Sequence, residues 1–188
     1  MIDHLYSQFH KHPNVGIACL YADYKDQTNQ TLAHILGSFL RQILTTAPEP
    51  VPDEIIHKLH DIRSRGGKVG TEDNLAMLKI QLQQLNRAFI CIDAVDELEP
   101  KVRRQLFSKL KELGTNTRLF LTGRGHIESE VARHFQVMQG YAVLVSASQQ
   151  DIQEFVIQQI KEDHDSDTMN EVLAKDIVDA IFQKSQGM

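Results

Sequence analysis

Three carboxylates and one arginine are the residues whose types and spacing could do chemistry in this sequence. Asp93, Asp96 and Glu97 directly follow the uncharged run Ala88–Ile92, and Arg124 follows a second apolar run, Arg118–Thr122. Clustered carboxylates can orient a hydrated magnesium ion or an attacking water molecule, and an arginine can bind a terminal phosphate by charge-assisted hydrogen bonds. The set therefore predicts a site for a magnesium-bound polyphosphate.

Both apolar runs have the composition of buried strands, being rich in β-branched and aromatic residues. Parallel strands end at the same edge of a sheet, and α/β sheets bind ligands at that carboxyl edge, so the acidic residues and Arg124 are expected to meet there. Two simpler interpretations remain open. The acidic residues could form a solvated turn, and Arg124 could form only a salt bridge to them.

The remaining pattern predicts an α/β fold with a parallel sheet flanked by helices on both faces. Two further strands are expected at Val15–Tyr21 and Tyr141–Val145. Apolar residues three and four positions apart predict helices near residues 1–11, 32–44, 55–62, 71–85, 100–113, 148–160 and 172–182, with N-caps at Thr71 and Ser148. The glycine-rich stretch 66–71 faintly resembles a phosphate-binding loop, but a helix precedes it where that motif needs a strand, so it is interpreted as a connecting loop.

Bulk composition narrows the class of protein. The chain has 188 residues, 41% of them hydrophobic and 24% charged, with a formal net charge of −5, as is typical of one soluble globular domain. The absence of a long basic run argues against a nucleic-acid surface, and no apolar run has the length of a membrane span. Cys19 and Cys91 lie inside apolar runs, which suits a reducing compartment, so a cytoplasmic protein is expected. The nine histidines lack zinc-type spacing and are interpreted as surface residues.

Several segments together resemble a known family. The run of four apolar residues and Asp93-Ala94-Val95-Asp96-Glu97 is similar to a Walker B element, and Leu119–Arg124 is similar to a strand that carries a sensor arginine. The opening segment, from Val15-Gly16-Ile17 to Tyr24-Lys25-Asp26-Gln27, and the ending Lys184–Met188 add to the likeness. The sequence thus resembles the NACHT class of signal-transduction P-loop NTPases, which belongs to the STAND class. The likeness is strongest to the nephrocystin-like N-terminal modules that are abundant in fungal proteins and are often followed by ankyrin repeats.

The resemblance implies a switch driven by ATP or GTP with Mg²⁺, in which nucleotide state controls self-association and signalling through protein partners. Carried over to this sequence, it implies that Asp93 binds the metal, that Asp96 and Glu97 are the catalytic acidic pair, and that Arg124 contacts the nucleotide. Ala94 replaces a common glycine, and Gly123 replaces a common serine.

One departure from the family pattern weighs more. The family begins with a strand, a Gly-x-x-x-x-Gly-Lys-Ser/Thr loop and a helix, whereas this sequence is expected to start inside that helix and to be one partial domain over residues 1–188, ending at the start of a helical region. A P-loop NTPase sheet that lacks its first strand is therefore expected, with weak nucleotide binding and negligible hydrolysis. The expected strand order is Val15–Tyr21, Ala88–Ile92, Arg118–Thr122, a vacancy and Tyr141–Val145, the last of which is expected to slide into the vacancy or to stay detached.

Two alternatives come from other classes of function. The chain could be a non-catalytic module that keeps only the NTPase scaffold and binds partner chains through an exposed sheet edge or helix face. It could also be a metal-dependent phosphohydrolase that uses the three carboxylates alone, although the sequence offers no nucleophile and no second acidic strand for that chemistry.

Overall fold

The computed structural model describes residues 2–9, 12, 14–46, 50–135, 142–143, 145, 148–162 and 171–185. The chain divides into two compact units, Met1–Met138 and Gln139–Met188. None of the helices in these ranges has both the length and the apolar character needed to cross a bilayer.

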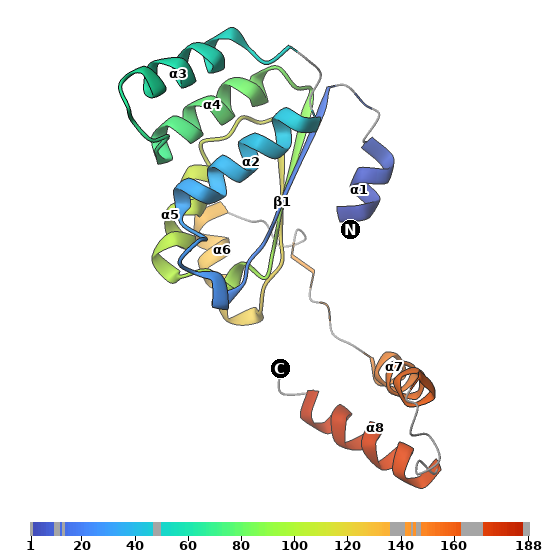
Figure 1. The fold of residues 1–188 in the computed structure, drawn as a ribbon. Coiled ribbons are helices and arrows are strands. Elements are labelled where there is room, and N and C mark those ends of the chain that lie inside the picture. The colour runs from blue at the N-terminus through green and yellow to red at the C-terminus, as the bar shows by residue number, and fades with distance from the viewer. Residues whose placement is uncertain are drawn as a thin grey trace. The chain divides into compact units, whose positions relative to one another are not determined.

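A parallel sheet of three strands lies at the centre of the first unit (Figure 1). Strands β1 (Val15–Tyr21), β2 (Arg87–Asp93) and β3 (Thr117–Leu121) are ordered β1-β2-β3, which is the order expected from the family resemblance. In the register of the sheet, Cys19 of β1 lies beside Cys91 of β2, and Cys91 lies beside Phe120 of β3. The central strand β2 is buried except at its ends because its residues are almost all apolar.

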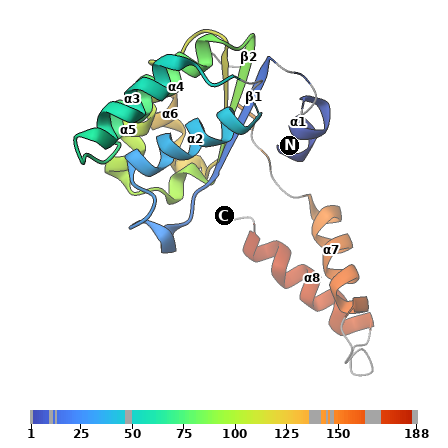
Figure 2. The same cartoon turned by 45° about the horizontal axis from the view of Figure 1, so that its top comes forward.

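Helices cover both faces of the sheet, which confirms the predicted α/β class (Figures 1 and 2). One face packs against α2 (Leu32–Thr46), α4 (Thr71–Gln83), α5 (Pro100–Leu110) and α6 (Glu128–Phe135), while α3 (Asp53–Ser64) packs on α4. The other face packs against α1 (Ile2–Phe9), through Leu5, Ile17, Phe89 and Cys91. Alternate residues of each strand point to opposite faces, so β1 and β2 contribute to both cores.

The structure differs from the sequence analysis in three local features. Helix α6 was not predicted from the sequence, although Val131 and Phe135 pack on the main core. The N-cap of α4 is Gly70, whose N–H donates to the Asp73 carboxylate at 3.1 Å, so Thr71 is the first helical residue. The predicted strand 141–145 lies partly outside the described residues, and Ala142, Val143 and Val145 are not in a strand.

The second unit contains α7 (Gln149–Glu162) and α8 (Glu171–Ser185). Its small core joins Ile152 and Val156 of α7 to Val178 of α8. The predicted cap of α7 is confirmed: the Asp151 N–H donates to the Ser148 hydroxyl at 3.1 Å, and the Ser148 N–H donates to the Asp151 carboxylate at 2.8 Å. This reciprocal capping box fixes where α7 begins.

Candidate functional site at the carboxyl edge of the sheet

The acidic turn, Asp93–Glu97, connects the end of β2 to α5. Ala94 has φ 51° and ψ 45°, a left-handed conformation that costs a non-glycine residue about 1–2 kcal/mol. The following residue, Val95, is fully buried and anchors the turn in the core. The left-handed Ala94 and the buried Val95 together fix the directions of the Asp93 and Asp96 side chains on either side of them.

Thr122, the residue after β3, ties the two strand ends together. Its hydroxyl donates to the Asp93 carboxylate and accepts the Ala94 N–H at 2.9 Å. Its backbone N–H donates to the Ile92 carbonyl, and its carbonyl accepts the Val95 N–H, both at 2.9 Å. The Asp93 carboxylate therefore has a fixed neighbour at the carboxyl edge of the sheet.

Asp96 and Arg124 form an ion pair between the acidic turn and the segment after β3. The Asp96 side chain is only 5% exposed, lies 3.7 Å from the Arg124 Nε and accepts the Arg124 backbone N–H at 3.3 Å. Gly123 permits this approach, because a Cβ there would lie 2.7 Å from Ile127 Cδ1 and 3.2 Å from the Asp96 carboxylate. The serine common in the resembling family would not fit here without a shift.

Glu97 contacts a different segment, the loop after β1. Its carboxylate accepts the Tyr24 N–H at 3.3 Å, and its carbonyl accepts a hydrogen bond from the Gln27 side chain at 3.4 Å. In the same loop, the Lys25 ammonium lies over the Tyr24 ring, 5.6 Å from its centroid.

A second arginine, Arg103 of α5, holds the acidic turn from inside. Its Nη1 donates to the carbonyls of Asp96 and Leu98 at 3.2 Å each, and its Nη2 donates to the Glu130 carboxylate of α6 at 2.8 Å. This hydrogen bond lowers the pKa of Glu130 below its ordinary value, against a smaller opposing effect of burial. Arg103 thus links α5, α6 and the acidic turn.

The predicted site residues all lie at the carboxyl edge, but they are not equivalent. Asp93 contacts Thr122, Asp96 is paired with Arg124, and Glu97 contacts the Tyr24 loop. Within the described ranges, no group of three or more histidine, cysteine or acidic side chains is placed to hold a metal ion by itself. The arrangement can offer a carboxylate to a hydrated ion and a guanidinium to an anion.

Two residues of this site, Thr122 and Arg103, were given no role from the sequence. Arg103 has a signal, since it precedes Leu106 by three residues and Phe107 by four and therefore lies on the inward stripe of α5. A charged residue on such a stripe needs a buried partner, which Glu130 supplies. The sequence indicates a role for Thr122 less clearly, since the only feature that marks it is a hydroxyl directly after an apolar strand.

The cysteines do not supply a nucleophile to this edge. Cys91 is 1% exposed, and burial, with a smaller contribution from Cys19, raises the pKa of its thiol to about 11. Burial also raises the pKa of Cys19. Both thiols therefore stay protonated near neutral pH and are unreactive.

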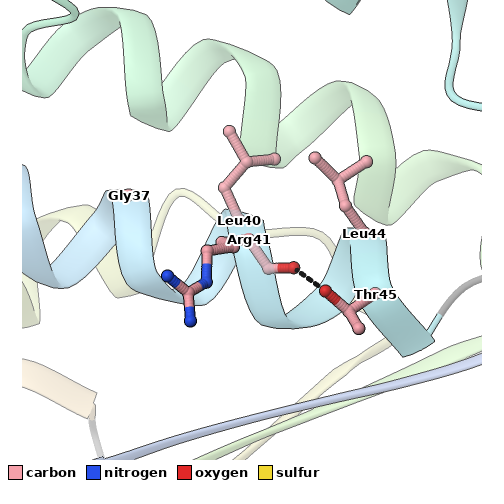
Figure 3. Close-up of a pocket in the computed structure, with 5 residues that line it drawn as sticks. All are labelled: Gly37, Leu40, Arg41, Leu44 and Thr45. Atoms are coloured by element: carbon pink, nitrogen blue, oxygen red, sulfur yellow. Dashed lines mark hydrogen bonds between the residues drawn. The ribbon is translucent and has the colours of Figure 1, made fainter.

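A shallow hollow of about 270 Å³ lies on α2 (Figure 3). It is lined by Gly37, Leu40, Arg41, Leu44 and Thr45, all from that one helix. The Thr45 hydroxyl donates to the Arg41 carbonyl at 2.8 Å, which is a bond within the helix. This hollow contains none of the residues of the acidic turn and is not the candidate site.

The fold and the carboxyl edge define a class of protein, an α/β module with a parallel sheet and an acidic turn beside an arginine. Comparison with family models then identifies the family, because the model described as Nephrocystin 3, N-terminal matches residues 1–124. The chain belongs to this family, and the match runs from α1 to Arg124. No curated protein matched the chain.

Proposed function

We propose that this chain is the core of a NACHT-type module of the fungal kind, a STAND-class signalling switch that a magnesium-bound ATP or GTP controls. The observation that supports the proposal is that Asp93, Glu97 and Arg124 all lie at the carboxyl edge of neighbouring parallel strands. In α/β sheets this is where ligands bind. Bound magnesium would supply the positive charge that offsets repulsion between phosphates and carboxylates.

The residues fit a hydrated magnesium ion better than a phosphate group. Magnesium keeps several water ligands and binds proteins through one or two carboxylates together with substrate phosphates, so Asp93 beside the Thr122 hydroxyl is a sufficient protein contribution. The sequence contains no Gly-x-x-x-x-Gly-Lys-Ser/Thr motif, however, so it offers no cradle of backbone amides for phosphates. The chain itself is therefore expected to bind nucleotide weakly and to hydrolyse it negligibly.

The geometry divides the proposed roles of the acidic pair. Asp96 is almost fully buried against Arg124, so we assign it the positioning of that arginine. Glu97 is half-buried, and its carboxylate accepts a backbone N–H of the Tyr24 loop rather than pairing with Arg124, so it is the better candidate to orient an attacking water molecule. Arg124, with its side chain 78% exposed, is free to bind the terminal phosphate.

Calorimetry with Mg-ATP and Mg-ADP tests this proposal, first on this chain and then on a chain extended upstream by a strand and a phosphate-binding loop. Weak or absent binding to the first and clear binding to the second are expected. In the extended chain, Asp93→Ala should abolish magnesium-dependent binding, while Glu97→Gln should spare binding and slow hydrolysis. An extended chain that folds but binds no nucleotide would contradict the proposal, and so would micromolar binding by the present chain that Asp93→Ala leaves unchanged.

A non-catalytic interaction module is the second candidate, and one observation favours it. The outer edge of β3 carries backbone groups with no partner among the described residues. An open edge is a ready template for another strand. The chain extended upstream distinguishes the two candidates. If the chain is an interaction module, the extended chain should fold without gaining affinity for nucleotide.

A further inference from the structure

A second cavity, of about 420 Å³, lies between the start of α3 and the end of α4, two helices that lie side by side (Figures 1 and 2). One wall is the connector Pro50–Asp53, and the other is formed by Gln81, Gln84 and Leu85. The volume falls within the range of about 300–1,000 Å³ that is usual for ligand pockets. Leu85 precedes β2, so this cavity lies near the amino end of that strand, whereas the acidic turn follows its carboxyl end.

Both walls of the cavity are held in place by the fold itself. On one side, Val51 packs against the main core, and the ring of Pro52 fixes the backbone at φ −54°. On the other side, the Asn116 side chain donates to the carbonyls of Leu82 and Leu85 at 2.7 and 2.8 Å. A ligand would therefore enter a site that is already formed, which lowers the cost of binding.

Gln81 is the residue of this cavity that packing does not explain. Among the described residues, three polar or charged side chains are buried, namely Asn74, Gln81 and Arg103. Asn74 donates to the Ala33 carbonyl at 2.9 Å, and Arg103 is bonded as described above. Gln81 is only 3% exposed, yet its Oε1 has no hydrogen-bond partner in the described part of the chain. Such an atom lowers stability unless a donor reaches it, and a ligand in the cavity that Gln81 lines could supply that donor.

The charges around the cavity favour a cation. Asp53 is the one charged residue among its described lining residues, and no ion pair or hydrogen bond within the described ranges engages its exposed carboxylate. The last turn of α4, which lies at the cavity, contains no basic residue. Because the C-terminal end of a helix carries partial negative charge, this end is left without a compensating cation. The cavity thus combines a negative surroundings with an acceptor that needs a donor.

We propose that this cavity binds a guanidinium group carried on an apolar stem. A guanidinium is planar, always charged, and has N–H donors on several sides, so it can donate to the Gln81 Oε1 and the Asp53 carboxylate together. An ammonium group is more strongly hydrated, and its three donors leave from one atom, so it fits acceptors on two walls less well. The stem would lie along Pro50, Pro52 and Leu85, as the alkyl part of such cations lies on apolar surface.

A free alkylguanidinium compound and an arginine side chain of a partner protein share this chemistry. In either case the cavity is separate from the acidic turn and contains none of its residues. The inference goes beyond the nucleotide proposal, and either can fail without the other.

Calorimetry of the full chain with n-butylguanidinium tests the proposal. Binding with a Kd of about 1 mM or tighter is expected, and neutral n-butylurea, of the same shape, should bind at least about tenfold more weakly because it carries no charge. If arginine capped as a peptide binds as well, the natural ligand is an arginine of a partner protein. If only n-butylguanidinium binds, the ligand is a free small molecule. No binding of either guanidinium at about 10 mM, or equal binding of n-butylurea, would overturn the proposal.

Substitutions show whether the probe occupies this cavity. Gln81→Leu keeps the size of the side chain and removes the amide, so it should weaken binding by about tenfold or more. The same variant should leave the unfolding midpoint of the free chain unchanged or higher, since the unpartnered oxygen is gone. Unchanged binding in this variant would overturn the proposal. A clear loss of stability would do so too, because the amide would then serve the fold.

A matched pair of charge substitutions separates the cavity from the helix terminus. Asp53→Asn should weaken binding of n-butylguanidinium by about fivefold. Glu54→Gln removes a charge from the same first turn of α3 but at a residue that does not line the cavity, so it should leave binding unchanged. Equal effects of the two substitutions would show that the Asp53 carboxylate does not contact the ligand, and would overturn the proposed site.

Discussion

Two arginines bind the acidic turn in opposite ways. Arg124 is 78% exposed at its side chain and makes one ion pair, at 3.7 Å from Asp96. Arg103 is 9% exposed and is bonded to two carbonyls of the chain around the turn and to Glu130. All three guanidinium nitrogens of Arg103 are hydrogen-bonded, so Arg103 maintains the turn, whereas the exposed guanidinium of Arg124 is accessible to a ligand.

The surroundings explain why the two ion pairs differ in energy. An ion pair whose guanidinium is exposed, as that of Arg124 is, gains little because water screens the charge and the long side chain loses freedom, so its value is about 0–1 kcal/mol. Breaking a buried pair costs about 3–5 kcal/mol because the remaining charge has no partner. Phe107 adds to this anchor by edge contacts with His134 and Phe135, at ring distances of 5.4 and 5.3 Å. We therefore expect substitutions to affect stability at Arg103 far more than at Arg124.

Arg103→Ala is expected to have the largest effect, a loss of about 3–5 kcal/mol in the free energy of unfolding. The substitution leaves Glu130 charged and half-buried, and it leaves the carbonyls of Asp96 and Leu98 without a donor. Urea unfolding measures the change, and Arg104→Ala, at an exposed neighbour on the same helix, should change stability by less than about 0.5 kcal/mol.

A double substitution keeps this prediction testable if Arg103→Ala does not fold. Arg103→Met with Glu130→Leu removes both charges, so it should recover part of the stability that Arg103→Met alone loses. Additive effects of the two substitutions would show that the pair does not anchor the turn.

Glu130→Gln is expected to have an intermediate effect that depends on pH. Arg103 lowers the pKa of Glu130 in the folded state, so the unfolded chain takes up the proton at a higher pH. The stability from this carboxylate is therefore complete above its unfolded pKa, about 4.3, and is lost as the pH falls through the lower folded pKa. The substitution should cost about 1.5–3 kcal/mol at pH 7, the value of a hydrogen bond to a charged group, and progressively less below about pH 4.

Urea unfolding at pH 7 and at acidic pH measures this change. Glu128→Gln, at the exposed first residue of α6, serves as the control. It should change the free energy of unfolding only slightly at both pH values. A cost for Glu130→Gln that is the same at pH 7 and pH 3 would contradict the anchor role of the carboxylate.

The sequence predicted strands β1, β2 and β3 because buried parallel strands are apolar throughout, as Ile90 and Ile92 illustrate, whereas their order was expected only from the family resemblance. It predicted less well wherever the outcome depends on contacts between segments. The burial of Asp96 depends on the absence of a side chain at Gly123, and the coverage of the β1 edge depends on Gln42 reaching Cys19 from α2. Helix α6 is only eight residues long and mostly charged or polar, so periodicity alone did not reveal it.

Arg124→Ala is expected to have the smallest effect on stability, within about 0.5 kcal/mol, because the guanidinium is exposed. The Asp96 carboxylate keeps its hydrogen bond from the backbone N–H of residue 124 in this variant. Arg124→Pro removes that donor as well, and it fits the observed φ of −74°, so it should cost more, about 1–3 kcal/mol for a buried carboxylate that loses its donor. Thermal unfolding of the two variants side by side separates the backbone from the side chain. A larger loss for Arg124→Ala than for Arg124→Pro would mean that the guanidinium is a structural anchor like Arg103, and the residue would then not be free for a phosphate.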